Sequence, residues 1–139
     1  MRLSVLLVMV TVPLRLAAQD EVPRIIHQGI DLMRSDNCAE AFDLWIGHWP
    51  DPQKSQMADS CSVLQENGGT LHGYDVLKVV TLTPHVSRVY LVLLYQKQPI
   101  YFMLLSYKPE QAWTVNTINW NTDPDKVIPK DLLPPMRPE

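Results

Sequence analysis

Residues 71–121 constrain the fold most strongly, because they predict four β-strands in succession. The predicted strands cover 71–82, 86–96, 100–108 and 113–121, and only three or four residues join each strand to the next. Connections this short force neighbouring strands to run antiparallel, since a parallel crossover needs a dozen or more residues. The sequence therefore predicts a four-stranded antiparallel sheet.

The two middle strands of this sheet are apolar on both faces. A sheet with one wet face alternates apolar with polar residues, but the runs 89–95 and 100–105 do not alternate. Because successive side chains of a strand point to opposite faces, both faces of the sheet need cover. The helices upstream can cover one face. We expect the other to be covered from outside the chain, by a second copy in a homodimer. The alternative is that the sheet curls so tightly, or the tail folds back so far, that one chain covers both faces.

Upstream of the strands, the sequence predicts three helices. The first opens at Val22-Pro23, and its apolar residues recur at nearly helical spacing as far as Met33. The second covers 38–46, and the third begins at Asp51-Pro52 and runs to about Gln65. Helices that precede a single antiparallel sheet indicate an α+β fold with the helices packed on one face.

The N-terminus has the pattern of a secretory signal peptide. Met1-Arg2 precedes the apolar run 3–14 and the small pair Ala17-Ala18, and the run is too short to span a bilayer as a helix. We expect cleavage after residue 18, which leaves an α+β domain at 19–128 and a Pro-rich tail at 129–139. The mature protein would then be periplasmic or extracellular, with no membrane attachment. The alternative is an uncleaved interfacial anchor.

The charge balance excludes several classes of partner. The chain carries 12 Lys and Arg against 15 Asp and Glu, and two of the basic residues, Arg2 and Arg15, belong to the predicted signal peptide. An acidic chain without a basic cluster is a poor candidate for binding nucleic acid or anionic membranes. The four histidines stand at no metal-ligand spacing, and no Gly-rich phosphate loop is present. We therefore expect neither a metal nor another cofactor.

Cys38 and Cys61 are the only two cysteines. In an exported protein an even number of cysteines indicates a disulfide. The bridge would join the start of the second helix to the end of the third, if these helices run antiparallel. The alternative is two buried thiols that act as small apolar side chains.

The order of helices and strands also carries a family resemblance. A helical pair at 33–45 precedes the sheet, and the sheet ends in Tyr107-Lys108-Pro109 and the Trp-led strand 113–122. Residues 24–128 thus resemble the small exported bacterial members of the nuclear transport factor two-like superfamily, the cystatin-like α+β roll. The resemblance implies a cone-like roll, with helices on a strongly bent sheet and a pocket at the wide end, and it also points to a dimer. That superfamily contains enzymes and non-enzymes alike, so the resemblance does not choose a function.

Trp45, Trp113 and Asn119 are the residues that we expect to border a ligand pocket. Strict alternation puts Trp113 on the same face of the last strand as Val115, Thr117 and Asn119, while Trp45 comes from the helical layer. Aromatic side chains next to polar groups are typical of a pocket wall. The alternative is that these tryptophans fill the core.

These features predict an exported, non-enzymatic module that dimerises through its sheet and holds a small apolar ligand. One alternative is an isomerase- or dehydratase-like enzyme of the same fold, which a His or carboxylate beside a Tyr in the cavity would favour. Another is a protein inhibitor or adaptor. No residue is assigned a catalytic role, because Tyr74 and Asp75, the only close acid–phenol pair in the sheet, point to opposite faces of their strand.

Overall fold

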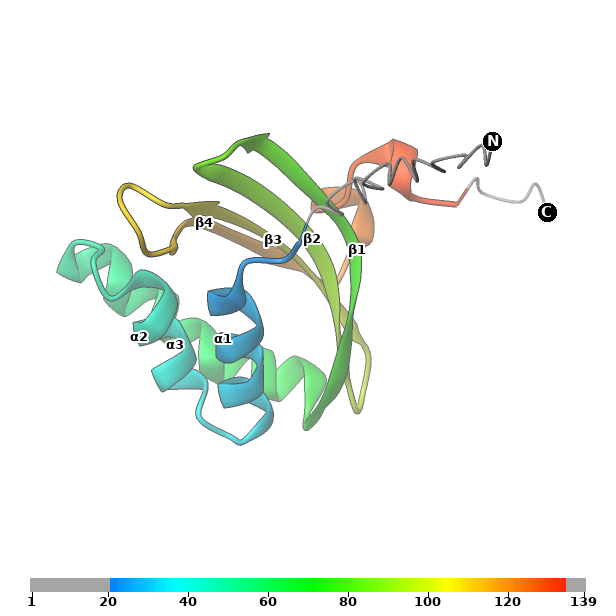
Figure 1. Ribbon diagram of the computed structural model, residues 1–139. Helices are drawn as coiled ribbons and strands as arrows, with labels where there is room; N and C mark the ends of the chain where they lie inside the picture. Colours follow the sequence, from blue (N-terminus) through cyan, green and yellow to red (C-terminus); the bar gives the residue numbers. More distant parts are fainter. Residues whose placement is uncertain (1–20, 135–139) are drawn as a thin grey trace, which may run out of the picture.

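Three helices are followed by a four-stranded antiparallel sheet in the computed structural model, which describes residues 21–134 (Figure 1). The elements are α1 Arg24–Arg34, α2 Cys38–Ile46, α3 Asp51–Gly68, β1 Leu71–Thr83, β2 Val86–Tyr95, β3 Pro99–Tyr107 and β4 Thr114–Asn121, followed by the 3-10 turns η1 Pro124–Lys126 and η2 Lys130–Leu132. The predicted α+β fold is therefore confirmed. The predicted signal peptide at 1–18 and the tail residues 135–139 lie outside the described residues.

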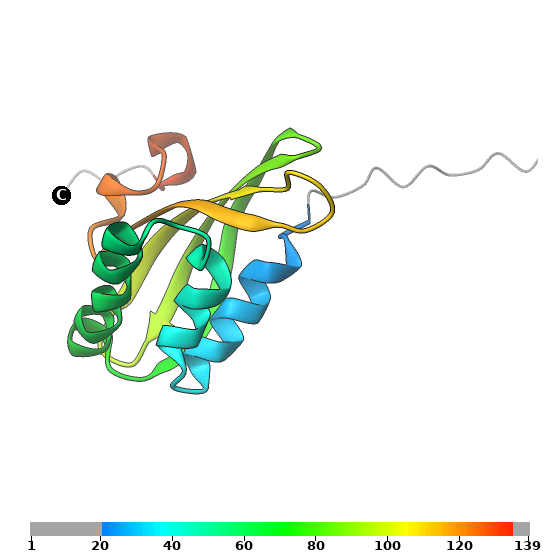
Figure 2. The same cartoon turned by 90° about the vertical axis from the view of Figure 1, so that its left-hand side faces the viewer.

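The sheet is a simple meander in the order β1-β2-β3-β4, with every neighbouring pair antiparallel. It is strongly curved, and all three helices lie on its concave side (Figure 1). Turned by 90°, the same layering is seen with the helices in front of the sheet (Figure 2). We call the helix-covered side the inner face and the opposite side the outer face.

Local chemistry explains where the helices begin and end. Pro52 stands in the first turn of α3, where its missing N–H costs no hydrogen bond. Gly69 ends α3 with a φ of 75°, in the left-handed region that favours glycine. One face of α1 is buried, at Ile26, Gly29, Ile30 and Met33. This stripe at helical spacing is what packs α1 against the sheet.

The main core lies between the helices and the inner face. On the inner face, alternate residues of the two middle strands are buried. They meet apolar side chains from all three helices. The largest fully buried side chains of this core are Trp45, Phe42, Phe102, Ile26, Ile30, Ile46 and Leu64.

The outer face is partly covered by the chain's own C-terminal segment. Val127 and Ile128, between η1 and η2, are buried against Tyr90 of β2. The Asp123 side chain accepts a hydrogen bond from the backbone N–H of Asp125 (3.0 Å), which starts the first turn of this segment. The cover therefore comes in part from within the chain, from the end of the predicted domain 19–128.

Some apolar side chains of the sheet remain exposed to solvent, although the segment around Val127 and Ile128 covers part of the outer face. Leu94 and Tyr107, near the ends of β2 and β3, are 38% and 39% exposed. A homodimer through the outer face stays a prediction, and the surface available to it is smaller than the sequence implied.

Candidate functional site

Two of the three predicted pocket residues, Trp45 and Asn119, lie on opposite sides of the sheet. Trp45 is only 1% exposed, and its Nε1 donates a hydrogen bond to the backbone oxygen of Ile25 (2.7 Å). Asn119 pairs across the strands with Met103 and shares the outer face with it. Trp113 lies just before β4, where the ammonium of Lys108 stands 5.2 Å from the centre of its ring. A shared role of these residues in ligand binding stays a prediction.

An irregularity in β4 changes which of its residues share a face of the sheet, compared with strict alternation. The register between β3 and β4 shifts after Leu105, which pairs with Thr117, because the next residue, Ser106, pairs with Val115. The extra residue changes the phase of the strand, so that Val115 and Ile118 both face the helices. Strict alternation puts Val115 and Ile118 on opposite faces, and for this strand that prediction was therefore wrong.

A cleft of about 440 Å³ opens at another place, beside the predicted disulfide. Its walls come from the α1–α2 turn, from α3 and from the start of β1. The residues that line it are Met33, Arg34, Asp36, Cys38, Ala39, Cys61, Ser62, Leu64, Gln65, Gly69, Thr70, Leu71 and Tyr95. We call this feature the disulfide cleft. Its volume lies within the range of about 300–1,000 Å³ that is usual for small-molecule sites.

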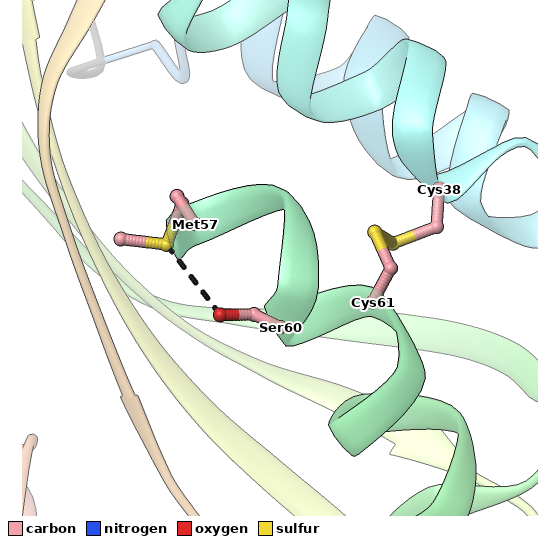
Figure 3. The surroundings of a disulfide bond; sticks show 4 residues. All are labelled: Cys38, Met57, Ser60 and Cys61. Carbon is pink, nitrogen blue, oxygen red and sulfur yellow. Dashed lines mark hydrogen bonds between the residues drawn. A yellow bond between two sulfur atoms is a disulfide. The ribbon is translucent and has the colours of Figure 1, made fainter. Parts of the chain in front are cut away.

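The disulfide forms one wall of this cleft and is confirmed. Cys38 in the first turn of α2 is bonded to Cys61 of α3, with the two Cα atoms 5.8 Å apart (Figure 3). On the same helix, the hydroxyl of Ser60 donates to the sulfur of Met57 at 3.8 Å (Figure 3). The bond fixes the spacing of α2 and α3 and thereby the width of the cleft.

The cleft has an apolar base and a polar rim. Met33, Leu64 and Leu71 are buried side chains of the core that also reach the cleft. Among the rim residues, Arg34 lies 3.9 Å from the carboxylate of Asp31, and Asp36 adds a second acid. The rim therefore has no excess positive charge to hold an anion. These surroundings suit an uncharged molecule that has both polar and apolar parts.

Tyr95 is the aromatic side chain of this cleft, and close packing holds its ring in place. A Cβ at Gly68 would lie 2.4 Å from Cγ of Tyr95, so only glycine lets α3 approach the ring this closely. Burial raises the pKa of the Tyr95 phenol to about 12. The side chain therefore keeps its proton at all physiological pH values and presents a neutral ring to the cleft.

The shifted pKa of Tyr95 predicts a loss of stability in strong alkali. The unfolded phenol has a pKa of 10.0 and the folded one of about 12. The contribution is therefore complete below pH 10 and is lost as the pH rises towards 12. The loss should reach about 2–3 kcal/mol. Urea unfolding at pH 9 and 11.5 measures it. Tyr95→Phe should remove this part of the pH dependence and the matched control Tyr107→Phe should keep it, whereas equal losses in all three proteins would contradict the assignment.

A hydrogen-bonded histidine–tyrosine pair lies on the seam between α1 and β1. Nδ1 of His27 and the hydroxyl of Tyr74 are bonded, although the residues are 47 positions apart. Burial and, secondarily, the carboxylate of Asp31 raise the pKa of Tyr74, against the opposing effect of Arg34. The phenol of Tyr74 therefore keeps its proton at neutral pH and can donate the hydrogen bond to Nδ1 of His27.

Sequence reasoning missed both the cleft and this pair. In the sequence, Gly68 and Gly69 indicate only the end of a helix, although Gly68 also lets α3 approach the ring of Tyr95 closely. His27 and Tyr74 meet only through the packing of α1 on β1, which no local pattern reveals. Within residues 21–134, no group of three or more His, Cys, Asp or Glu side chains could hold a metal ion.

Comparison of the chain with protein-family models, with curated protein sequences and with solved structures finds no match. The likeness to the nuclear transport factor two-like superfamily thus depends on the architecture alone. Helices on the concave side of a curved antiparallel sheet agree with that likeness, and other α+β folds share the same layering.

Proposed function

We propose that the chain is an exported, non-enzymatic binding module that holds a small, uncharged molecule with polar and apolar parts in the disulfide cleft. The observation that carries the proposal is the cleft itself, with about 440 Å³ of space over an apolar base. Its shape is maintained by a covalent bond in one wall and by the packed ring of Tyr95 in another. A preformed cleft of this kind lowers the entropic cost of binding.

The export part of the proposal is supported by the disulfide. Disulfides persist in oxidising compartments such as the periplasm and the extracellular space, and they are rare in the cytosol. Among residues 21–134, no helix is both long enough and apolar enough to cross a membrane. We also propose that the fold is a cystatin-like α+β roll, which the bent sheet and its helical layer support.

An enzyme of the same fold is the weaker alternative. The pair formed by His27 and Tyr74 is the arrangement that would favour it, since both side chains can transfer protons. However, the raised pKa of Tyr74 makes its phenolate scarce at neutral pH, and Nδ1 of His27 is already hydrogen-bonded to the hydroxyl of Tyr74. In the described part of the chain, no carboxylate hydrogen-bonds to His27 to orient it. The pair is better explained as a structural hydrogen bond that holds α1 against β1.

Isothermal titration calorimetry with 1-naphthol, a neutral aromatic probe, tests the cleft. At the usual efficiency of about 0.5 kcal/mol per heavy atom, we expect a single site with a dissociation constant of about 0.1 mM. Ser62→Trp should fill the cleft, because Ser62 is an exposed lining residue on α3, and should weaken binding at least about tenfold.

Ser55→Trp is the matched control for this experiment. Ser55 is an exposed residue of the same helix that does not line the cleft, so its replacement should leave 1-naphthol binding unchanged. No measurable binding to the wild type, or equal weakening by both tryptophan variants, would contradict the proposal.

A further inference from the structure

β1 forms one edge of the sheet and exposes apolar side chains along it. Among the described residues, β2 is the only strand that pairs with it, although β1 is 13 residues long. Val76, Leu77 and Leu82 are 38%, 43% and 51% exposed. A long edge with exposed apolar residues is a template for pairing with another strand. Three of the exposed large apolar residues of the described chain thus lie on this one strand.

We propose that β1 pairs antiparallel with β1 of a second copy, across a two-fold axis between Val76 and Leu77. The sheet of each copy would then continue into that of the other, giving eight strands in one dimer. A two-fold pairing of identical surfaces is the commonest form of self-association. This proposal does not depend on the disulfide cleft.

Charge complementarity selects this register. Asp75 and Lys78 are the only Asp, Glu, Lys or Arg residues of β1, both are exposed, and within the described residues neither forms an ion pair. With the axis between Val76 and Leu77, Asp75 of each copy lies opposite Lys78 of the other, so that two ion pairs form. Every other two-fold register along β1 separates these opposite charges. It sets each against an uncharged residue or, when the axis passes through Asp75 or Lys78, against the same charge of the second copy.

The irregularity in β1 makes this pairing possible on one face. Asp75 pairs with Val92 of β2, and Lys78 pairs with Tyr90. Val92 and Tyr90 are two residues apart on β2 and therefore point to the same face. The register shift between Val76 and Lys78 accounts for the extra residue, Leu77, so both charges project from the outer face. Directly opposed side chains on neighbouring strands have Cβ atoms about 5 Å apart, which suits an ion pair.

The apolar residues fit the same register. At the axis, Val76 of each copy lies opposite Leu77 of the other, so two of the exposed apolar side chains become covered in each copy. Towards the ends of the pairing, the exposed Leu82 lies opposite Leu71 of the second copy. The segment around Val127 and Ile128 covers part of the outer face, where it also packs against Val80 of β1. Among the described residues, no strand pairs with the free edge of β1.

Two charge-reversal variants test the register. Asp75→Lys sets two lysines against each other at both ion-pair positions, and Lys78→Asp sets two aspartates against each other there. Each variant alone thus converts two attractions into two repulsions. At about 0.5 kcal/mol for each attraction lost and each repulsion gained, the dimer dissociation constant should rise about thirtyfold. An equimolar mixture of the two variants can form a one-to-one heterodimer, in which one position pairs the two introduced charges and the other pairs the two native ones.

Sedimentation equilibrium of the full chain, exported from a bacterial host and carrying its disulfide, provides the measurement. We expect a wild-type dimer, two largely monomeric variants and a more strongly associated mixture at the same total concentration. Asp59→Lys, at an exposed site on α3, is the control and should remain as dimeric as the wild type. A monomeric wild type, or single variants that dimerise like the wild type, would overturn the proposal. Near-UV circular dichroism establishes that each variant is folded.

The double variant Asp75→Lys/Lys78→Asp should restore the dimer that each single variant weakens, and it is the decisive test of the register. It exchanges the two charges within each copy, so that opposite charges again face each other at both positions of a homodimer. We expect its dimer dissociation constant to return to within about threefold of the wild-type value. A double variant that stays as monomeric as the single variants would overturn the proposed register.

Discussion

Replacing Trp45 by alanine should lower the free energy of unfolding by about 3–5 kcal/mol. The indole is almost completely buried, packs edge-on against Phe42 and lies against Gly29, where even a Cβ would stand 2.1 Å from the ring. The substitution removes this contact between α1 and α2 together with the hydrogen bond to the oxygen of Ile25. Urea unfolding, followed by circular dichroism, measures the loss.

Trp113→Ala is the matched control for this substitution. Trp113 is half-buried beside the β3–β4 connection, and its contact with Lys108 contributes about 0.5–1 kcal/mol. If Trp45→Ala does not fold, Trp45→Phe keeps a large ring, and a smaller loss should still be measurable. A loss below about 1 kcal/mol in Trp45→Ala would contradict the core assignment. It would favour the sequence-based prediction that Trp45 borders a ligand site.

The double substitution Cys38→Ser/Cys61→Ser should lower the free energy of unfolding by about 3 kcal/mol. The bond closes the loop that contains the α2–α3 connection and therefore restricts the unfolded chain. The same loss should appear in the wild type after reduction. Because the bond also fixes one wall of the disulfide cleft, the serine variant should bind 1-naphthol more weakly at a temperature where it is still folded.

A control is needed to show that the disulfide is present in the purified protein. The unfolded, non-reduced protein is treated with a thiol-alkylating reagent and its intact mass is measured. We expect no added label in the wild type and two labels after reduction. A serine variant that is as stable as the oxidised wild type would contradict a structural role for the disulfide.

The layering of the fold could be predicted from the sequence because its signals are local. Short connections fixed the antiparallel order of the strands, and the predicted strand 71–82 differs from β1 by a single residue. The helix 38–46 and the bond between Cys38 and Cys61 were also predicted. In each case neighbouring residues, or the number of cysteines, carry the information.

The details that decide the site could not be predicted because they are set by tertiary packing. The register shift in β4 has no clear mark in the sequence, yet it brings Val115 and Ile118 to the same face of the sheet. The return of Val127 and Ile128 onto the outer face depends on two short turns rather than on a periodic pattern. The cleft arises where the α1–α2 turn, α3 and β1 fail to fill the space between them, and a sequence does not show such a gap.

The most direct test of the central claim is to locate the bound probe. Amide chemical shifts of ¹⁵N-labelled protein should be recorded by NMR as 1-naphthol is added. We predict that the amides that shift belong to residues 33–39 and 61–71, which surround the disulfide cleft. Shifts confined to residues 113–119, with the cleft amides unmoved, would contradict the claim and would place the ligand beside Trp113 and Asn119.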